Sequence, residues 1–431
     1  MSDFTSLPSD DGQTSRIQQQ ASAKTAFFNH KKINYSVLKD RAYNLRWATV
    51  PKGVLPLTAA DPDFPVAPEI PKAIQKYAQA GVFSYGPSEG LATFRNAAAK
   101  VLKERKQVDC TPEMILPIDG AASGMFTVAR MALEPGDEAI IFDPVDFLFQ
   151  QSVEAAGGKV VRLPFDMKTR TFDPEVLESL ITPRTKMICV CNPHNPLGRV
   201  LNKEELELLG KVAVENKLWI MNDEIWSDIV YSDSQFESIV NVHPWVAERT
   251  ISVHGFSKTF GLAGLRIGFI VAPNQVVYDK LIAASKVSTT AAGVTTISQI
   301  AATTAYEDCW YWAEAFVDHL EDVRDYAYNR INAIEGLHCQ KPEGTYVFFV
   351  NIQAFGISEE AMADYLFKKA KVAVVPGAAK WFGPGAVGHI RICFSTSIEI
   401  VKAALDRIEM ALMKLRVQQS NADLHPRSVG A

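Results

Sequence analysis

Two cations stand in unusual surroundings in the second half of the chain. Lys258 lies in the run HGFSKTFGLAGLRIGF, which begins at His254, and Arg266 follows eight positions later. An unpaired cation among apolar residues is costly, so such a side chain is usually exposed, paired or functional. A lysine that forms a Schiff base with an aldehyde cofactor uses this setting, and an arginine fork beside it neutralises a phosphate. Taken alone, a lysine and an arginine at this spacing are more often two unrelated surface cations, and a phosphorylated aldehyde cofactor is the alternative that uses both.

A carboxylate and an amide follow two other apolar runs. Asp223 ends the run KLWIMND, and Asn195 lies in CNPHNPLGRV at 191–200. An aspartate at the end of a strand can simply cap the next helix. An ionised aspartate paired with a pyridine nitrogen would instead keep a cofactor ring protonated and able to accept electrons. The segment with two prolines reads, by itself, as a turn.

Two further segments have the chemistry of anion sites. The stretch IDGAASGMFTVARMAL at 118–133 leads from an apolar run through small residues into a helical pattern. Small residues at a helix start let backbone N–H groups approach a phosphate, although close helix packing explains them equally well. Arg391 interrupts the apolar strand GHIRICFST, and a buried arginine normally needs a carboxylate partner. That partner is either a structural ion pair or a ligand.

In this order along the chain, the motifs resemble the fold-type I pyridoxal-phosphate (PLP) enzymes, the aspartate aminotransferase superfamily, over about residues 50–400. The resemblance implies that Lys258 holds PLP and moves the substrate's α-proton, that Asp223 pairs with the ring nitrogen, and that Arg391 binds the substrate's α-carboxylate. It also implies that Asn195 contacts the phenolic oxygen and that its bond to Pro196 is cis. Further cofactor contacts are expected from Gly120, Ala121, Ala122, Ser257 and Arg266, and substrate contacts from Ala60 and Asn195.

A tyrosine motif bears on the assembly. The run SYGPSEGLATFRNAAAK at 84–100 resembles the superfamily's Tyr-x-Pro-x-x-Gly turn. The resemblance implies that Tyr85 reaches the phosphate of a partner chain, so that a homodimer shares its active sites. An aromatic side chain that packs against a turn is the alternative.

Three positions depart from the superfamily's common pattern. Where an aromatic ring usually stacks on the cofactor the chain has Asp146, so either the adjacent Phe147 takes over the stacking or Asp146 faces the ring and serves another task. Trp226 replaces a tyrosine, and its indole can donate a hydrogen bond but not accept one. Gly255 stands where many members have a phosphate-binding serine.

The reaction type stays open at this stage. The strings TAADPDFP at 58–65 and CNPHNPLGRV resemble the C–S lyase branch, the cystathionine β-lyase-like proteins, as closely as they do aminotransferases. An aminotransferase acting on an amino acid is the leading interpretation, with β- or γ-elimination or an eliminative cyclisation as the alternative. A non-catalytic PLP-binding regulator is a distant third. The resemblance implies that members specific for dicarboxylates use a second arginine, from the partner's segment before the long helix. The corresponding segment 286–299 offers Lys286 but no arginine, which disfavours a simple aspartate or glutamate enzyme.

The elements that position these residues alternate between strand and helix. Apolar runs at 138–143, 159–165, 186–192, 217–223, 250–256 and 267–273 predict buried strands, and 203–216 has helical spacing. This alternation predicts an α/β fold with a mostly parallel sheet and with ligands at the carboxyl edge, and the resemblance implies a sheet of the seven-stranded type. From about 305 a long helical stretch, further strands and a last helix indicate a smaller α+β domain.

The expected domain boundaries follow from these patterns together with the resemblance. They are a mobile polar arm at 1–29, a segment at 30–65, a large PLP-binding domain at 66–304, the small domain at 305–416, and a flexible tail at 417–431. The resemblance implies that the segment at 30–65 joins the small domain. A chain of 431 residues is long for one core, which favours two domains.

Composition excludes several classes of protein. A net charge of −5 without a long basic block argues against nucleic-acid binding, and no apolar run is long enough to span a membrane. The six cysteines are too sparse for a disulfide framework, and Cys189 and Cys191 lack a second ligand pair, so no metal site is predicted. The segment before residue 30 is too short for a DNA-binding module of a regulator. A cytoplasmic enzyme is the simplest expectation.

Overall fold

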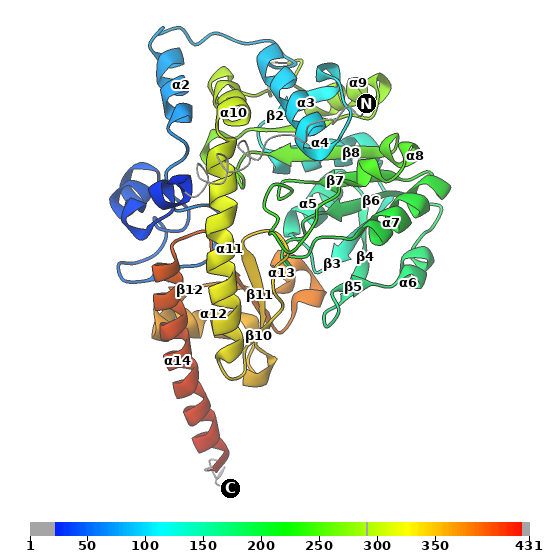
Figure 1. Cartoon of the computed structure of the whole chain (residues 1–431). Coiled ribbons are helices and arrows are strands. Elements are labelled where there is room, and N and C mark those ends of the chain that lie inside the picture. The colour runs from blue at the N-terminus through cyan, green and yellow to red at the C-terminus, as the bar shows by residue number, and fades with distance from the viewer. Residues whose placement is uncertain (1–21, 290–291, 425–431) are drawn as a thin grey trace, which may run out of the picture.

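The computed structural model describes residues 22–289 and 292–424. At the centre of this part lies an eight-stranded sheet in the order β2-β9-β8-β7-β6-β3-β4-β5 (Figure 1). Its strands are β2 (Ile115–Ile118), β3 (Glu138–Asp143), β4 (Lys159–Asp166), β5 (Thr171–Phe172), β6 (Thr185–Cys191), β7 (Trp219–Asp223), β8 (Thr250–Gly255) and β9 (Gly268–Val271).

The prediction of a mostly parallel sheet is confirmed. The five neighbouring strands from β8 to β4 run parallel, whereas β9 and β5 run antiparallel to their neighbours. The eighth strand, beyond the seven expected, is the two-residue β5, which pairs only with the end of β4. Strands β3 and β8 are buried along their whole length, as expected for strands covered on both faces.

Helices connect these strands and cover the sheet. Helix α7 has the predicted extent, and a capping box between Asn202 and Glu205 fixes its start. The helices of this part are α2 (Glu69–Ala78), α3 (Ala92–Lys106), α4 (Ala121–Ala132), α5 (Phe147–Ala155), α6 (Pro174–Ser179), α7 (Lys203–Glu215), α8 (Pro244–Ala247), α9 (Gln275–Ser285) and α10 (Thr296–Asp308).

The carboxyl ends of the parallel strands meet along one edge of the sheet. Strand β6 ends at Cys191, which pairs with Asp223 at the end of β7, and Asp223 pairs with Val253 near the end of β8. The loops that carry Asn195 and Lys258 leave from this edge. Segments far apart in the sequence therefore come together here.

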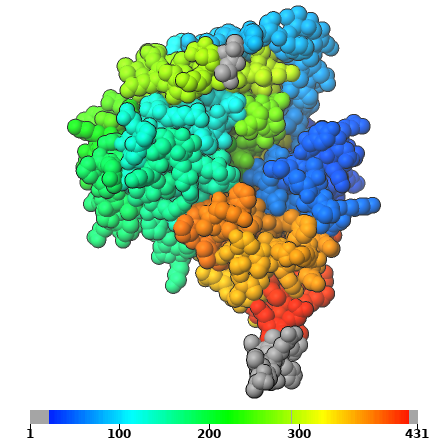
Figure 2. All heavy atoms as spheres, turned by 180° about the vertical axis from the view of Figure 1, so that it is seen from behind, coloured from blue at the N-terminus to red at the C-terminus, as the bar shows by residue number. Residues whose placement is uncertain are grey.

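A second sheet lies towards the C-terminus. It is antiparallel, in the order β10 (His338–Cys339), β11 (Val347–Asn351), β14 (His389–Cys393) and β13 (Val375–Pro376). Strand β1 (Leu55–Pro56) pairs in parallel with β12 (Val372–Ala373), which ties the segment before residue 65 to this part. The remaining helices are α11 (Trp310–Ala333), α12 (Glu359–Tyr365), α13 (Ala379–Phe382) and α14 (Ile398–Leu424). Helix α11 runs from the large sheet to these strands (Figure 1), and Figure 2 shows the orange segment that contains α13 against the large-sheet part.

The helical stretch expected at 305–334 is two helices. Helix α10 begins at Thr296 and ends at Asp308, and α11 starts after Cys309. The expected boundary at 305 therefore falls inside α10. Helical residues on both sides of Cys309 hid the break, because no glycine or proline marks it.

The expectations for the two ends of the chain were wrong for the residues that the structure describes. Residues 22–27 are helical, and Phe28, only 4% exposed, packs its ring 5.0 Å from Trp312 and 5.2 Å from Phe316. Helix α14 continues to Leu424, well past 417, since no glycine or proline interrupts it. The rest of both predicted segments lies outside the described residues. Within the described part, no helix is both long and apolar enough to cross a bilayer.

Candidate active site

The predicted residues gather around one cavity of about 310 Å³ at the carboxyl edge of the large sheet. All of them line it except Phe147 and Tyr85. The predicted residues in the lining are Ala60, Gly120, Ala121, Ala122, Asn195, Asp223, Trp226, Ser257, Lys258, Arg266 and Arg391. They come from the N-terminal segment, the central sheet and the C-terminal strands, so the cavity lies where the large and the small sheet meet.

Lys258 follows strand β8 by three residues and points its amine into the cavity. Nζ donates a hydrogen bond of 2.8 Å to the carbonyl oxygen of Ala60 and lies 5.1 Å from the centroid of the Trp226 ring. Burial lowers the pKa of Lys258, and the nearby Asp61 carboxylate opposes this effect. An amine with a lowered pKa is neutral more often and is a better nucleophile.

Asp223 is the last residue of β7. Its Oδ1 accepts a 3.0 Å hydrogen bond from the backbone N–H of Ile225. Burial raises the pKa of Asp223 to about 7, Asp146 acts in the same direction and Lys258 opposes it. A cationic partner would keep this carboxylate ionised at neutral pH, so the residue fits a protonated ring nitrogen.

The start of α4 and Arg266 form a concave anion site. Gly120 caps α4 with a φ of 114°, and a Cβ there would lie 2.8 Å from Nη2 of Arg266. A Cβ at Gly268 would lie 2.9 Å from the backbone nitrogen of Ala121. Only glycine allows this close approach of turn, helix start and guanidinium. Backbone N–H groups at a helix N-terminus beside an arginine fit a phosphate.

Arg391 lies on β14 with its guanidinium in the cavity. Nη1 donates to Oδ1 of Asn195 and Nη2 to the carbonyl of Thr58, each at 3.2 Å, whereas the buried Nε has no partner among the described residues. The guanidinium also lies 5.3 Å from the centroid of the Phe382 ring. Burial lowers the pKa of Arg391. Among the described residues the hydrogen bonds of this buried cation go to neutral oxygens, which fits an incoming carboxylate.

The Asn195 loop lies between Arg391 and helix α5. The Asn195–Pro196 bond is cis, as expected. Asn195 Nδ2 donates at 2.9 Å to Oδ2 of Asp146, which also caps α5 by accepting from the backbone N–H of Leu148. Burial raises the pKa of Asp146, and Arg391 and Lys258 oppose this.

Phe147 does not lie where stacking on the cofactor requires it. Its ring packs edge-on against Trp381 at 5.3 Å and is absent from the cavity lining, whereas Asp146 belongs to the lining. Of the two alternatives for this position, the geometry supports the one in which Asp146 faces the cavity. The reason is local: Asp146 caps α5, so the first helical residue turns away.

Gly255 and Tyr85 have different surroundings. A Cβ at Gly255 would approach the side chain of Ile225 to 3.2 Å, so close packing accounts for the missing serine. Tyr85 is 90% exposed and lines a separate open hollow of about 1000 Å³. Within its own chain Tyr85 therefore has no part in the cavity.

Two residues beside Lys258 escaped the sequence analysis. The hydroxyl of Tyr346 donates at 3.2 Å to the same Ala60 carbonyl that accepts from Lys258, and its ring packs edge-on against Trp226 at 4.6 Å. The Asp61 carboxylate, which accepts from Asn44, is an electrostatic partner of Lys258. Asp61 lies in the string TAADPDFP at 58–65, which resembles the C–S lyase branch, whereas no spacing pattern marks Tyr346.

Comparisons with known proteins agree with this geometry. The family model for aminotransferase class I and II matches residues 52–408. An aspartate aminotransferase of Pyrococcus abyssi is 32% identical over 85% of this chain and 93% of its own. An aromatic-amino-acid aminotransferase of Thermococcus litoralis has the same identity and coverage. A PLP-bound putative aminotransferase from Clostridium difficile superposes with a TM-score of 0.80 at 26% identity, covering 89% of this chain and all of that one.

Proposed function

The chain belongs to the class I and II aminotransferase family and is a PLP-dependent aminotransferase, and on that premise we propose that it removes the amino group of a monocarboxylic amino acid at the cavity around Lys258. The observation that carries the proposal is the convergence of Lys258, Asp223, Arg266 and Arg391 on one cavity. When bound, the cofactor ring withdraws electrons from the substrate's α-carbon.

The residues of the cavity divide into groups that suit the parts of the cofactor. Arg266, the helix start at residues 120–122 and Ser257 would hold the phosphate. Asp223 would hold the ring nitrogen, and Asn195 would donate to the phenolic oxygen. The glycine-dependent approach of Gly120 to Arg266 supports the phosphate assignment, because it brings the guanidinium next to the start of α4.

Lys258 would hold the cofactor through Nζ and then, once the substrate has displaced it, take the α-proton at the same nitrogen. Its lowered pKa supports this role, since a general base must be neutral when the proton arrives. The carbonyl of Ala60 directs the amine, and the Trp226 ring excludes water on one side.

Arg391 would bind the substrate's α-carboxylate through its fork and orient the α-proton towards Lys258. Among the described residues that line the cavity, Arg266 and Arg391 are the arginines, and Arg266 suits the phosphate. A second carboxylate on the substrate would therefore find no further arginine among the described lining residues of its own chain. We infer a neutral substrate side chain, which agrees with the aromatic-amino-acid name of one relative and differs from the aspartate name of the other.

Borohydride reduction followed by peptide mapping tests the role of Lys258. The pyridoxyl group should appear on Lys258 and be absent from the Lys258→Ala variant. Lys286 is exposed, and the control variant Lys286→Ala should still be labelled on Lys258. Label on any other lysine would contradict the assignment.

A substrate panel tests the reaction. Neutral amino acids should yield keto acids only when an α-keto acid acceptor is present, and aspartate should react much more slowly. Ammonia and a keto acid formed without an acceptor would instead indicate elimination.

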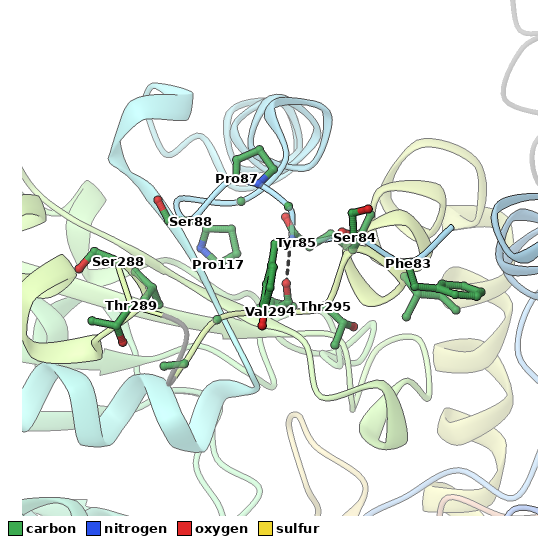
Figure 3. Close-up of a pocket in the computed structure, with 18 of the residues that line it drawn as sticks. Phe83, Ser84, Tyr85, Pro87, Ser88, Pro117, Ser288, Thr289, Val294 and Thr295 are labelled. Carbon is green, nitrogen blue, oxygen red and sulfur yellow. Dashed lines mark hydrogen bonds between the residues drawn. The ribbon is translucent and has the colours of Figure 1, made fainter. Parts of the chain in front are cut away.

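We further propose a homodimer in which Tyr85 reaches the partner's phosphate. Support comes from the open hollow in Figure 3, where the segment at Phe83–Ser88 faces residues 288–289 and 292–295. Phe83, which lines this hollow, is 66% exposed, and apolar exposure of this kind is typical of a surface that another chain covers.

The division of the chain into domains and its compartment also remain proposals. We propose a large cofactor-binding domain that begins at 66 and a small domain that ends at 416, divided at the helix break near Cys309 and not at 305, because 305 lies inside α10. The segment at 30–65 belongs to the small domain, and the pairing of β1 with β12 supports that assignment. A cytoplasmic location is supported by the six cysteines, which are all unpaired.

A further inference from the structure

Three side chains form a hydrogen-bonded line across the cavity wall. Asp146 Oδ2 accepts from Nδ2 of Asn195 at 2.9 Å, and Oδ1 of Asn195 accepts from Nη1 of Arg391 at 3.2 Å. The backbone N–H of Asp146 also donates to the Asn195 carbonyl at 3.2 Å, so the first two residues are joined twice. Asp146 is the N-cap of α5 in the large-sheet part, and Arg391 lies on β14 of the small sheet. The line therefore links the two parts of the structure.

The chemistry of the two outer groups permits one orientation of the amide between them. An ionised carboxylate only accepts hydrogen bonds and a guanidinium only donates them. The amide must therefore turn its NH₂ group to Asp146 and its oxygen to Arg391. In the flipped orientation, a donor would face Arg391 and an acceptor would face Asp146, and both hydrogen bonds would be lost.

Helix capping alone does not explain an aspartate at this position. Oδ1 of Asp146 accepts from the backbone N–H of Leu148, and serine or asparagine would cap a helix equally well. The second carboxylate oxygen is what those residues cannot reproduce. That oxygen is the one that holds Asn195.

We propose that Asp146 is a positioning residue that fixes the orientation of the Asn195 amide and thereby holds Arg391 ready for the substrate's carboxylate. This inference rests on the proposed role of Arg391. Held by Asn195 at Nη1 and by Thr58 at Nη2, the guanidinium keeps one rotamer before the substrate arrives. Less side-chain freedom is then lost on binding.

Two substitutions separate positioning from capping. Asp146→Ser keeps the cap and removes the acceptor for Asn195. Asp146→Asn also keeps the cap but turns a donor towards Nδ2 of Asn195, which favours the flipped amide. The matched control is Asp173→Asn, because Asp173 caps α6 in the same way and lies outside the cavity lining.

The probe is ¹³C-labelled propanoate, a monocarboxylate without an amino group, and its dissociation constant from each holoenzyme is measured by NMR line broadening. Asp146→Ser should weaken propanoate binding about threefold to fivefold, because Asn195 loses its hydrogen bond to the carboxylate. Asp146→Asn should weaken it about tenfold or more, because the flipped amide also turns a donor towards Arg391. KM for an amino acid should rise in the same order with a smaller change in kcat. Asp173→Asn should match the wild type in all three measurements, and melting temperatures should verify folding.

The variant Arg391→Lys separates the positioning role of Asp146 from the carboxylate-binding role of Arg391. If it loses propanoate while Asp146→Asn binds like the wild type, the positioning role is overturned and the role of Arg391 stands. If Arg391→Lys itself binds propanoate normally, there is no carboxylate clamp to position, and both ideas fall. Equal weakening by Asp146→Ser and Asp146→Asn would also overturn the selection of the amide orientation.

Discussion

Burial moves the pKa values of Lys258 and Asp223 in opposite directions, and both shifts move the pKa towards neutral pH. The pKa of the Lys258 amine falls, and that of the Asp223 carboxyl rises to about 7. Groups whose pKa lies near the working pH exchange protons at little cost. The bound cofactor would reverse the shift at Asp223, because a protonated ring nitrogen stabilises the ionised form.

Asp223→Asn tests the electrostatic part of this arrangement. The amide keeps the shape of the side chain but cannot balance a protonated ring nitrogen, so turnover should fall by about 10²-fold or more while the protein still folds. Asp166→Asn is the matched control, since Asp166 also ends a parallel strand of the same sheet but is exposed. Normal turnover in Asp223→Asn would mean that the ring nitrogen has another partner.

The burial of His194 predicts that the protein loses stability in acid. His194 is fully buried, edge-on to Phe165 at 5.0 Å, and neither ring nitrogen has a partner among the described residues. Burial, with help from Arg199, lowers the pKa of His194 to about 3. Below the ordinary value of about 6.5 the unfolded chain takes up a proton that the folded chain refuses, so the stability present above pH 6.5 is lost as the pH falls towards 3.

The size of this effect can be measured with His194→Leu. Between pH 7 and 4.5 the unfolding free energy of the wild type should fall by about 2–3 kcal/mol more than that of the variant. The reason is that pH 4.5 lies about two units below the pKa of a histidine in the unfolded chain, and each unit is worth about 1.4 kcal/mol. Denaturant unfolding at both pH values gives the numbers. His338→Leu, an exposed control, should follow the wild type, and the same acid loss in His194→Leu would contradict the linkage.

At the scale of elements, the contacts between distant segments decide where the site lies. Strand β1 pairs with β12, which places Ala60 and Asp61 just beyond β1 and opposite Lys258. Helix α11 runs alongside and packs against Phe28 near its start. The segment around residues 22–64 is therefore part of the cavity's support.

The variant Phe28→Ala measures how much the packing of the segment around residues 22–64 contributes to the free energy of unfolding. Deleting a buried phenylalanine ring leaves a cavity and costs about 3–5 kcal/mol of unfolding free energy. Leu45→Ala, at a side chain that is 67% exposed, should change it by less than about 0.5 kcal/mol. Comparable values for the two variants in denaturant titrations would show that the packing of Phe28 contributes little.

At the scale of the whole molecule, the proposed homodimer completes the phosphate site. Tyr85→Phe should weaken cofactor retention by about 1.5–3 kcal/mol, the usual loss for a hydrogen bond to a charged group. Mixing these chains with an excess of Lys258→Ala chains gives heterodimers in which one site carries both lesions and the other carries neither. Activity measured against PLP concentration should then regain the wild-type affinity. An affinity that stays low after verified subunit exchange would mean that Tyr85 serves its own chain.

The sequence by itself determined the local features. Apolar runs of four to eight residues predicted β3, β6, β7 and β8 almost to the residue. Because parallel strands end at one edge, the residues that follow them, such as Asn195 and Lys258, had to lie near Asp223. Residues fixed by strand ends and turns are readable from spacing, since their positions depend on the neighbouring chain.

Only the tertiary structure decided what faces these residues. Tyr346 meets the Ala60 carbonyl across 286 positions of sequence, and no local pattern marks it. The choice between Asp146 and Phe147 depended on how α5 is capped and on where Trp381 packs. Phe28, expected in a mobile arm, is buried by α11. Contacts of this kind arise from the packing of whole elements, and packing depends on shapes that distant segments present to one another.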